Sequence, residues 1–133
     1  MEIKLLKKCR LDYLDLLGQL TVCEAVDLRK RQRFFEQKKT FLIYDPELVG
    51  CISYYVEPKL NRGGSLVAHI EDLVVDQAHR GKGYGKILIQ TAFDDILKFE
   101  LPYKIILNCS EENVAFYEKC GFHRAGVEMR IDL

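Results

Sequence analysis

The chain has 133 residues, 48% of them hydrophobic, which suits one folded domain with a buried core. Twenty Lys and Arg residues balance twenty Asp and Glu residues, so the strongly basic surface of a typical nucleic-acid-binding domain is excluded. No apolar run approaches the roughly 18 residues that cross a membrane. Charged residues also interrupt the apolar ones at the start of the chain, unlike in a signal peptide, so we expect no membrane contact.

Five cysteines are present, and their odd number and irregular spacing match neither a disulfide framework nor a zinc motif. We therefore expect no metal, and reduced thiols that mostly fill the core of a cytoplasmic protein. The five are Cys9, Cys23, Cys51, Cys109 and Cys120.

The first half of the chain predicts two helices followed by a β-hairpin. Apolar residues recur at helical spacing over residues 11–20 and, among many charges, over residues 22–37. Short β-rich runs at residues 40–44 and 48–56 flank Asp45-Pro46-Glu47, whose composition is typical of a turn.

The second half alternates strands with helices, which indicates some parallel pairing and an α/β (α+β) fold in a single domain. Ser110 is a candidate N-cap and Gly121 a candidate helix end. The expected elements are a strand at residues 69–75, a glycine-rich loop at 76–85, an amphipathic helix at 86–98, a strand at 104–109, a short helix at 113–120 and one or two strands at 123–133.

The glycine-rich loop contains Arg80-Gly81-Lys82-Gly83-Tyr84-Gly85. A strand, loop and helix in this order present backbone N–H groups and a helix N-terminus at one point, which binds phosphate or pyrophosphate. Glycines allow close approach of the backbone to such a ligand, and Arg80, Lys82 and Lys86 add positive charge. The alternative is a plain turn that happens to hold three glycines.

Two other phosphate-binding motifs do not fit this loop. A P-loop requires Ser or Thr after Gly-Lys, whereas Ile87 follows Gly85-Lys86. A dinucleotide-binding loop requires a glycine three positions after its second one, whereas Lys86 stands three positions after Gly83. The pattern Arg-x-x-Gly-x-Gly from Arg80 to Gly85 resembles instead the coenzyme A signature of the GNAT N-acetyltransferase superfamily.

A second motif near the C-terminus, Asn113-Val114-Ala115-Phe116-Tyr117 followed by Gly121-Phe122, is also similar to that superfamily. Acetyl transfer expels a thiolate from the thioester, and a tyrosine hydroxyl stays protonated at neutral pH and donates to it. Tyr117 is therefore our candidate acid, and Asn113 lies one helical turn earlier on the same face. The alternative for Tyr117 is half-buried packing.

Four segments, residues 17–21, 69–75, 103–107 and 113–126, together resemble the glucosamine 6-phosphate N-acetyltransferase family. The resemblance implies the GNAT acyl-CoA N-acyltransferase fold, with a central mixed, mostly antiparallel sheet flanked by helices, and a homodimer. It implies that acetyl-CoA acetylates the amine of D-glucosamine 6-phosphate in a direct ternary complex, a step toward UDP-N-acetylglucosamine. No acyl-enzyme and no metal are expected.

The same resemblance implies which residues contact each substrate. The cofactor contacts are the backbone of Leu73, Val74 and Val75 with the pantetheine arm, the loop Arg80, Gly81, Lys82, Gly83, Tyr84, Gly85 and Lys86 with the pyrophosphate, and Asn113 and Tyr117. The sugar contacts are Thr21, Glu71, Asp72 and Leu73, with Lys59, Leu60, Asn61, Arg62, Tyr103 and Lys104 around the sugar phosphate. The alternatives are solvated loop charge for Lys59 and Arg62, and capping of nearby amides for Glu71 and Asp72.

Two positions depart from that family. Asn108 stands where the family carries a carboxylate, and asparagine cannot act as a base. Our candidate catalytic residues are Tyr117, Glu71 and Asn108. The identity of the general base stays open. Asp132 stands where the family has a basic residue near its C-terminus, although Arg130 could reach a phosphate.

Two alternatives to the sugar reaction remain. The first is a GNAT enzyme for another amine, such as a polyamine, an amino acid or a protein N-terminus, because a fold does not fix a substrate. The second is a non-catalytic acetyl-CoA-binding module, for which Asn108 is the main argument.

Overall fold

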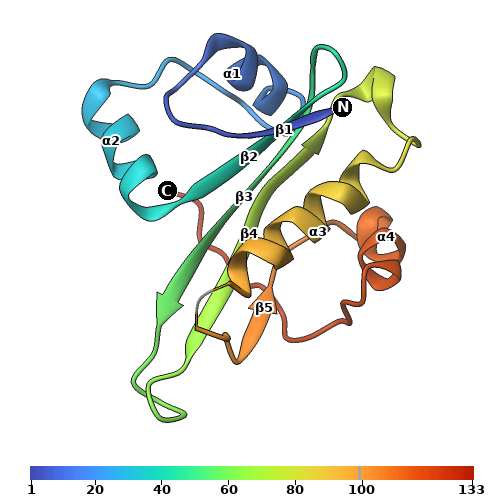
Figure 1. Cartoon of the computed structure of the whole chain (residues 1–133). Coiled ribbons are helices and arrows are strands. Elements are labelled where there is room, and N and C mark those ends of the chain that lie inside the picture. Colours follow the sequence, from blue (N-terminus) through green and yellow to red (C-terminus); the bar gives the residue numbers. More distant parts are fainter. Residues whose placement is uncertain (99) are drawn as a thin grey trace.

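The computed structural model describes residues 1–98 and 100–133, which form one five-stranded sheet (Figure 1). The strands lie in sequence order, and every neighbouring pair is antiparallel except the last, which is parallel. The mixed, mostly antiparallel sheet is thus confirmed. Its strands are β1 (Glu2–Leu5), β2 (Lys39–Tyr44), β3 (Leu48–Pro58), β4 (Leu66–Val75) and β5 (Lys104–Ile106).

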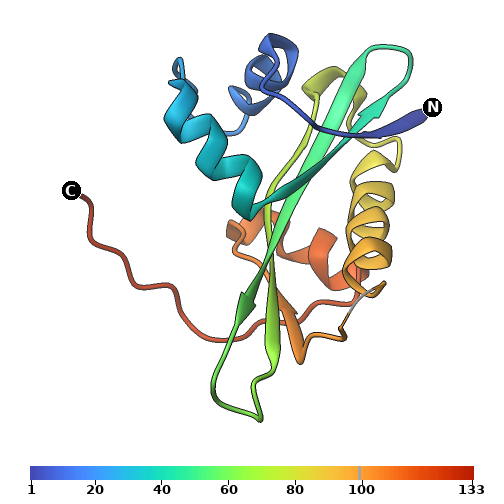
Figure 2. The same ribbon diagram turned by 60° about the vertical axis from the view of Figure 1, so that its left-hand side comes forward.

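Helices cover both faces of the sheet (Figures 1 and 2). Two apolar clusters join the helices to the sheet, one on each face. The first two α-helices belong to one cluster and the last two to the other. The α-helices are α1 (Leu11–Leu17), α2 (Leu28–Gln37), α3 (Tyr84–Ile96) and α4 (Val114–Lys119), and two 3₁₀ turns are η1 (Gln77–His79) and η2 (Glu111–Asn113).

The two faces of the sheet carry separate apolar clusters because successive strand residues point to opposite sides. On one face, Leu88 and Ala92 of α3 pack against Ile43 and Ile52, and all four are fully buried. On the other face, the buried α1 residues Tyr13 and Leu16 pack against the sheet. Their neighbours on the strands are Leu42, Cys51 and Val74. The apolar stripe predicted for α3 is therefore the principal helix–sheet contact.

Several elements differ from the sequence prediction, and three of the differences have a clear local cause. An additional strand, β1, pairs with β2, and the alternation Glu2-Ile3-Lys4-Leu5 is the period-two signal that identifies it. Helix α2 begins at Leu28 rather than at residue 22, because the Asp27 side chain accepts a hydrogen bond from the Lys30 N–H and caps the helix there. Strand β5 ends at Ile106 rather than at Cys109.

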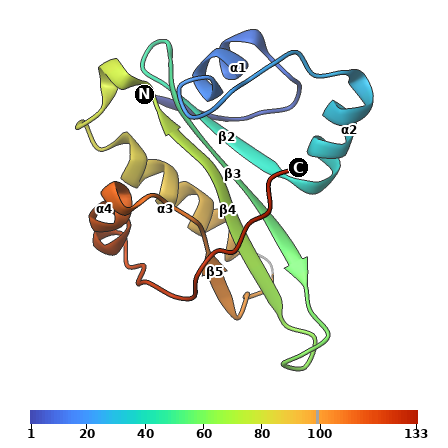
Figure 3. The same cartoon turned by 180° about the vertical axis from the view of Figure 1, so that it is seen from behind.

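The predicted final strand at residues 123–133 is wrong for the single chain. These residues are extended without a strand partner, and they cross the side of the sheet opposite to α3 before leaving the body (Figures 2 and 3). A strand requires a neighbour whose backbone completes its hydrogen bonds, and β5 offers only three residues. We refer to residues 123–133 as the C-terminal tail.

A buried carboxylate joins α3 to the sheet. Asp95 is 8% exposed, and its Oδ2 accepts hydrogen bonds from the Lys39 Nζ at 2.7 Å and the Tyr54 hydroxyl at 2.5 Å. Burial alone would raise the pKa of Asp95, but these two donors outweigh it and lower the pKa below its ordinary value. The ionised carboxylate therefore stabilises the folded state.

No helix in the described part of the chain, residues 1–98 and 100–133, is long and apolar enough to cross a membrane.

We predict that Asp95→Asn lowers the free energy of unfolding by about 1–3 kcal/mol at pH 7, because Lys39 and Tyr54 lose a charged acceptor. The folded-state pKa is lowered, so the wild-type advantage should be full above the unfolded-state pKa of about 4 and should shrink as the pH falls below it. Urea denaturation at several pH values measures both effects. Asp94→Asn, which alters an exposed i,i+4 contact with Gln90, is the matched control and should change the unfolding free energy by less than about 0.5 kcal/mol.

Candidate active site

Strands β4 and β5 pair at only three positions, Val67 with Lys104, Ala68 with Ile105 and His69 with Ile106. Beyond these pairs the two segments line opposite sides of a cavity of about 1390 Å³, with residues 70–75 on one side and residues 107–110 on the other. Backbone groups of a parallel strand that lack a neighbouring strand are free to bind an extended ligand. The separation of β4 from β5 therefore creates the site.

The predicted glycine loop forms one end of this cavity. Gly81 and Gly83 have φ angles of 80° and 89°, a region that other residues rarely occupy. Gly83 is the N-cap of α3 and supplies no side-chain cap, so the first-turn N–H groups are available to an external acceptor. With the cationic side chains of Arg80 and Lys86 in the cavity lining, this end suits a pyrophosphate.

Gly85 sets the position of α4 against α3. A Cβ atom at Gly85 would lie 3.0 Å from the Phe116 ring, so any other residue would push this ring away by a few tenths of an ångström. Phe116 and Tyr117 contact each other edge to face, with ring centroids 5.0 Å apart, and both line the cavity. The packing of Phe116 on Gly85 thereby brings Tyr117 close to the glycine loop.

Tyr117 is held in a half-buried environment by Phe122, whose ring centroid lies 5.9 Å away. Burial raises the pKa of Tyr117 to about 12, and the neighbouring Cys109 and Cys120 thiols add to the increase. Its hydroxyl is therefore a hydrogen-bond donor throughout the physiological pH range.

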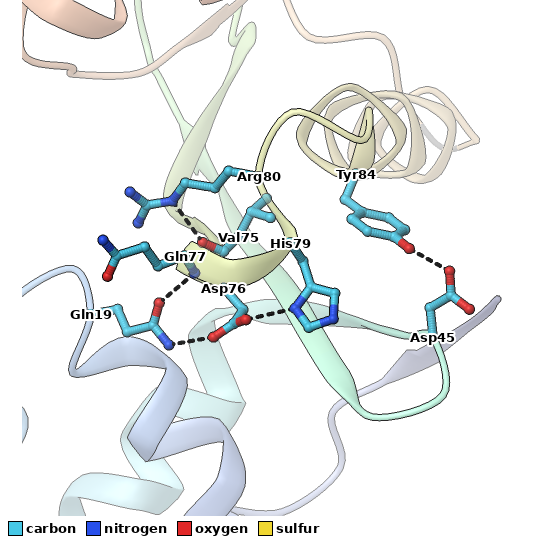
Figure 4. Close-up of polar contacts among 8 residues, drawn as sticks. All are labelled: Gln19, Asp45, Val75, Asp76, Gln77, His79, Arg80 and Tyr84. Carbon is cyan, nitrogen blue, oxygen red and sulfur yellow. Dashed lines mark hydrogen bonds and ion pairs between the residues drawn. The ribbon is translucent and has the colours of Figure 1, made fainter.

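Gln19, in the segment that follows α1, binds the beginning of the glycine loop (Figure 4). The Gln19 Nε2 donates to Asp76 Oδ1 at 2.7 Å, and the Gln19 Oε1 accepts from the Gln77 N–H at 2.9 Å. The Asp76 Oδ2 also pairs with the His79 Nδ1 at 2.6 Å. These hydrogen bonds from Gln19 and His79 lower the pKa of Asp76 below its ordinary value. We call Gln19, Asp76, Gln77 and His79 the loop latch.

Two further contacts complete the support of the loop (Figure 4). The Arg80 Nε donates to the Val75 carbonyl oxygen at 3.1 Å, which directs this side chain back along β4. The Tyr84 hydroxyl donates to Asp45 in the β2–β3 turn, so the first turn of α3 is tied to the sheet. The loop is thus supported by polar contacts from three separate parts of the chain.

The acidic pair Glu71-Asp72 lies in β4 at an irregularity in its pairing with β3. Asp72 has a φ angle of 50°, so the strand direction changes locally. Glu71 raises the pKa of Tyr55, while Asp72 raises those of the buried Tyr13 and Cys51. Burial is the larger cause in all three cases. Ile70 and Leu73 pack into the α3-side cluster, so the two acids between them lie on the α1 face of the sheet.

Comparison with known proteins agrees with this arrangement. The acetyltransferase (GNAT) family model matches residues 10–122. The chain belongs to the GNAT acetyltransferase family. A glucosamine 6-phosphate N-acetyltransferase of Trypanosoma brucei brucei is 38% identical over 145 aligned positions, covering 100% of this chain and 96% of that protein.

Two solved structures have the same GNAT fold over almost their whole length. A crystal structure of an acetyltransferase from Trypanosoma brucei superposes with a TM-score of 0.87 at 35% identity, covering 99% of each chain. The glucosamine-6-phosphate N-acetyltransferase of Arabidopsis thaliana gives a TM-score of 0.83 at 32% identity, again covering 99% of each chain.

Most predicted cofactor contacts of this GNAT protein line the cavity. Lys82 belongs to the loop but does not line it. The predicted residues that do are Glu71, Asp72, Leu73, Val74, Val75, Arg80, Gly81, Gly83, Tyr84, Gly85, Lys86, Asn108, Asn113 and Tyr117.

The predicted sugar-phosphate residues lie elsewhere in the single chain. Lys59, Leu60, Asn61 and Arg62 are in the β3–β4 hairpin loop, where Leu60 is fully exposed. Arg62 and Lys104 both stack near the Tyr103 ring, at 4.2 Å and 5.3 Å from its centroid. Thr21 is exposed and does not line the cavity, although Gln19 and Leu20 do. The structure therefore gathers a basic cluster but does not bring it to the cavity.

Several cavity residues had no functional prediction from the sequence, and three of them form polar contacts that shape the cavity. Gln19 and His79 belong to the loop latch, and Glu128 of the C-terminal tail reaches the cavity at Asn108. The contacts of Gln19 and Glu128 join residues far apart in the sequence, so no sequence motif encodes them. Only the His79–Asp76 pair, three positions apart, has a spacing typical of a turn. In residues 1–98 and 100–133, no cluster of three or more His, Cys, Asp or Glu side chains could hold a metal ion.

We predict that Gln19→Ala loosens the glycine loop, because the Gln77 N–H loses its acceptor. Losing about 1 kcal/mol of net hydrogen-bond energy should increase the exchange rate of the Gln77 amide roughly fivefold. Amide hydrogen exchange followed by NMR measures this rate. Gln32→Ala, which removes a glutamine paired with Glu36 on α2, is the control and should leave the Gln77 rate unchanged. Equal Gln77 exchange in Gln19→Ala and wild type would contradict the latch.

Proposed function

We propose that this GNAT protein is a glucosamine 6-phosphate N-acetyltransferase. It transfers the acetyl group of acetyl-CoA to the 2-amine of D-glucosamine 6-phosphate, producing N-acetyl-D-glucosamine 6-phosphate and CoA, toward UDP-N-acetylglucosamine. The observation that carries the proposal is the cavity, which links an anion-binding helix N-terminus to Tyr117 and to acidic residues on β4. The similarity across the whole chain to a protein with this activity supports the choice of substrate.

Acetyl-CoA would lie along the cavity with its pyrophosphate at the glycine loop. The N–H groups at the start of α3, with Arg80 and Lys86, supply donors and positive charge for two phosphates. The pantetheine arm would run past residues 73–75, where its amides meet the free edge of β4. Asn113, at the start of α4, lies beside this path.

The transfer step is a direct attack in a ternary complex. The amine nitrogen attacks the thioester carbon, the carbon–sulfur bond breaks, and Tyr117 donates a hydrogen bond and then its proton to the departing thiolate. The half-buried hydroxyl, with its raised pKa, supports this function because it does not ionise before the thiolate forms. No cysteine acts as a nucleophile in this mechanism.

The sugar would occupy the part of the cavity near Glu71 and Asp72, whose carboxylates suit hydroxyl and ammonium groups. The basic cluster of Arg62 and Lys104 around Tyr103, together with Lys59, is our candidate for the phosphate contact. The exposed hairpin that carries Lys59 and Arg62 would have to approach the sugar from the same chain or from a partner.

The protein is proposed to act as a cytoplasmic homodimer. On the C-terminal tail, Val127, Met129 and Ile131 are 86–87% exposed and alternate with polar residues. An exposed apolar row of this kind is typical of a surface that pairs with another chain. All five cysteines are free, which is consistent with a reducing compartment.

A substrate panel tests the function. We predict rapid CoA release with glucosamine 6-phosphate and at least tenfold lower kcat/KM with glucosamine, because the phosphate contributes charge-assisted hydrogen bonds. Spermidine and free amino acids should give still less. CoA release should be followed by mass spectrometry rather than a thiol reagent, because the chain has five free thiols. Comparable rates with and without the sugar phosphate would overturn the substrate assignment, and acetyl-CoA binding without any amine turnover would favour a non-catalytic module.

A second prediction concerns the acid. Tyr117→Phe should reduce kcat roughly 10²–10³-fold with a nearly unchanged acetyl-CoA dissociation constant, because only the hydroxyl is lost from a packed ring. Tyr44→Phe removes a phenol hydroxyl on β2 from a residue that does not line the cavity, and it serves as the control for the loss of a phenol. Steady-state kinetics with calorimetric acetyl-CoA titrations separate the two effects. Unchanged kcat in Tyr117→Phe would remove Tyr117 from the acid function.

A further inference from the structure

The C-terminal tail places a carboxylate inside the cavity. The Asn108 Nδ2, just beyond the end of β5, donates a hydrogen bond to the Glu128 Oε1 at 2.9 Å. The two residues are 20 positions apart, and both line the cavity. An asparagine amide cannot accept a proton from an amine, but its N–H can hold a carboxylate in place. This pair therefore supplies at the end of β5 the carboxylate that the sequence of β5 itself lacks.

An ion pair and a glycine turn direct the tail toward this position. Arg124 pairs with both oxygens of Glu111 in η2, at 2.8 Å and 2.6 Å, so the start of the tail is held against η2, next to the cavity residues Ser110 and Glu112. Gly126 then has a φ angle of 68°, which allows the chain to turn. Successive side chains of an extended segment point to opposite sides. Glu128 therefore points to the side opposite to its neighbours Val127 and Met129, which face solvent.

Glu128 and Tyr117 approach the same short segment. Asn108, which binds Glu128, directly precedes Cys109, and both residues line the same cavity as Tyr117. A proton donor and a carboxylate therefore share one cavity with the residues at the end of β5. This is the arrangement needed to deprotonate an attacking amine and protonate a leaving thiolate in one site.

The other cavity acids on the sheet lie on β4 and not at the end of β5. Glu71 pairs with Ser53 of β3, and Asp72 follows it at the irregularity between these two strands. Their positions suit binding of sugar hydroxyls. Glu128, by contrast, has one oxygen held by Asn108 and a second oxygen with no partner among the hydrogen bonds of the described residues.

We infer that Glu128 is the catalytic proton acceptor of this acetyltransferase, an inference that rests on the proposed function. The substrate ammonium gives one proton to Glu128, which later releases it to water. The free amine attacks the thioester carbon, the carbon–sulfur bond breaks, and the thiolate takes the Tyr117 proton. The second nitrogen proton, lost as the amide forms, restores Tyr117, so the net products are the amide, CoA and one proton.

The pH dependence of kcat/KM distinguishes this base from a purely structural residue. With a carboxylate acceptor, the reactive complex carries the ammonium proton, so kcat/KM should be nearly flat between the pKa values of the carboxylate and the amine. In Glu128→Gln the free amine must be present beforehand, so log kcat/KM should fall by about one per pH unit on acidification from pH 8 to 6. The other titratable or charged residues that line the cavity are His69, Glu71, Asp72, His79, Arg80, Tyr84, Lys86, Cys109, Glu112 and Tyr117.

The expected loss in Glu128→Gln at pH 6.5 is roughly 10²-fold in kcat/KM, with acetyl-CoA affinity unchanged. Adding Asn108→Asp to this variant should restore the flat profile and at least a tenth of the activity, because it returns a carboxylate to the same place. Glu118→Gln, an exposed α4 acid outside the cavity lining, is the matched control and should retain wild-type kinetics.

The outcomes separate this inference from the proposed function. Wild-type turnover of glucosamine 6-phosphate with an unchanged rate and pH profile in Glu128→Gln would overturn the inference and leave the function standing. A reduced rate with a flat profile, unrestored by Asn108→Asp, would assign Glu128 to tail placement and would also overturn the inference. Absence of wild-type turnover would overturn the proposed function and the inference with it.

Discussion

The short parallel contact between β4 and β5 is the constraint on which the site depends. A parallel pair requires a crossover, and here the crossover contains the glycine loop and α3. The helix therefore begins where β4 ends, and its N-terminus meets the opening created as β5 separates. If β5 continued alongside β4, its backbone would occupy the edge of β4 that now lines the cavity. Three residue pairs are enough to align the strands, and their small number leaves the cavity.

The two sides of this cavity are stabilised in different ways. Helix α3 is anchored by apolar packing, with Leu88 and Ala92 fully buried, and by the buried carboxylate of Asp95. The glycine loop has little apolar surface and depends on polar contacts, chiefly those of Gln19. Polar contacts near solvent contribute less than core packing, so we expect the loop to open at lower free energy than α3. The cavity therefore combines a firmly packed helix with a more weakly held loop.

Local patterns in the sequence predicted the elements that surround the cavity. The period of α3, the glycines that precede it and the Asn113–Tyr117 motif all express short-range geometry, and the structure gathers them in one cavity. Contacts between distant residues were not predictable in this way. Gln19 and Asp76 are 57 positions apart, and each residue alone resembles any exposed polar side chain. The final strand failed for a related reason, because its alternating apolar residues report a propensity and not the presence of a partner.

The C-terminal tail shows how one extended segment can perform two tasks. Its alternation assigns Glu128 to the cavity while Val127, Met129 and Ile131 remain on the outer side. A partner covering the apolar row would bury the tail without displacing the carboxylate, and it would restrict the motion of the backbone that carries it. Since Arg124 already fixes the start of the tail, such cover would mainly order the residues beyond Gly126. Association through this segment and the placement of the proposed catalytic carboxylate would then be linked, because side chains of an extended chain alternate between its two sides.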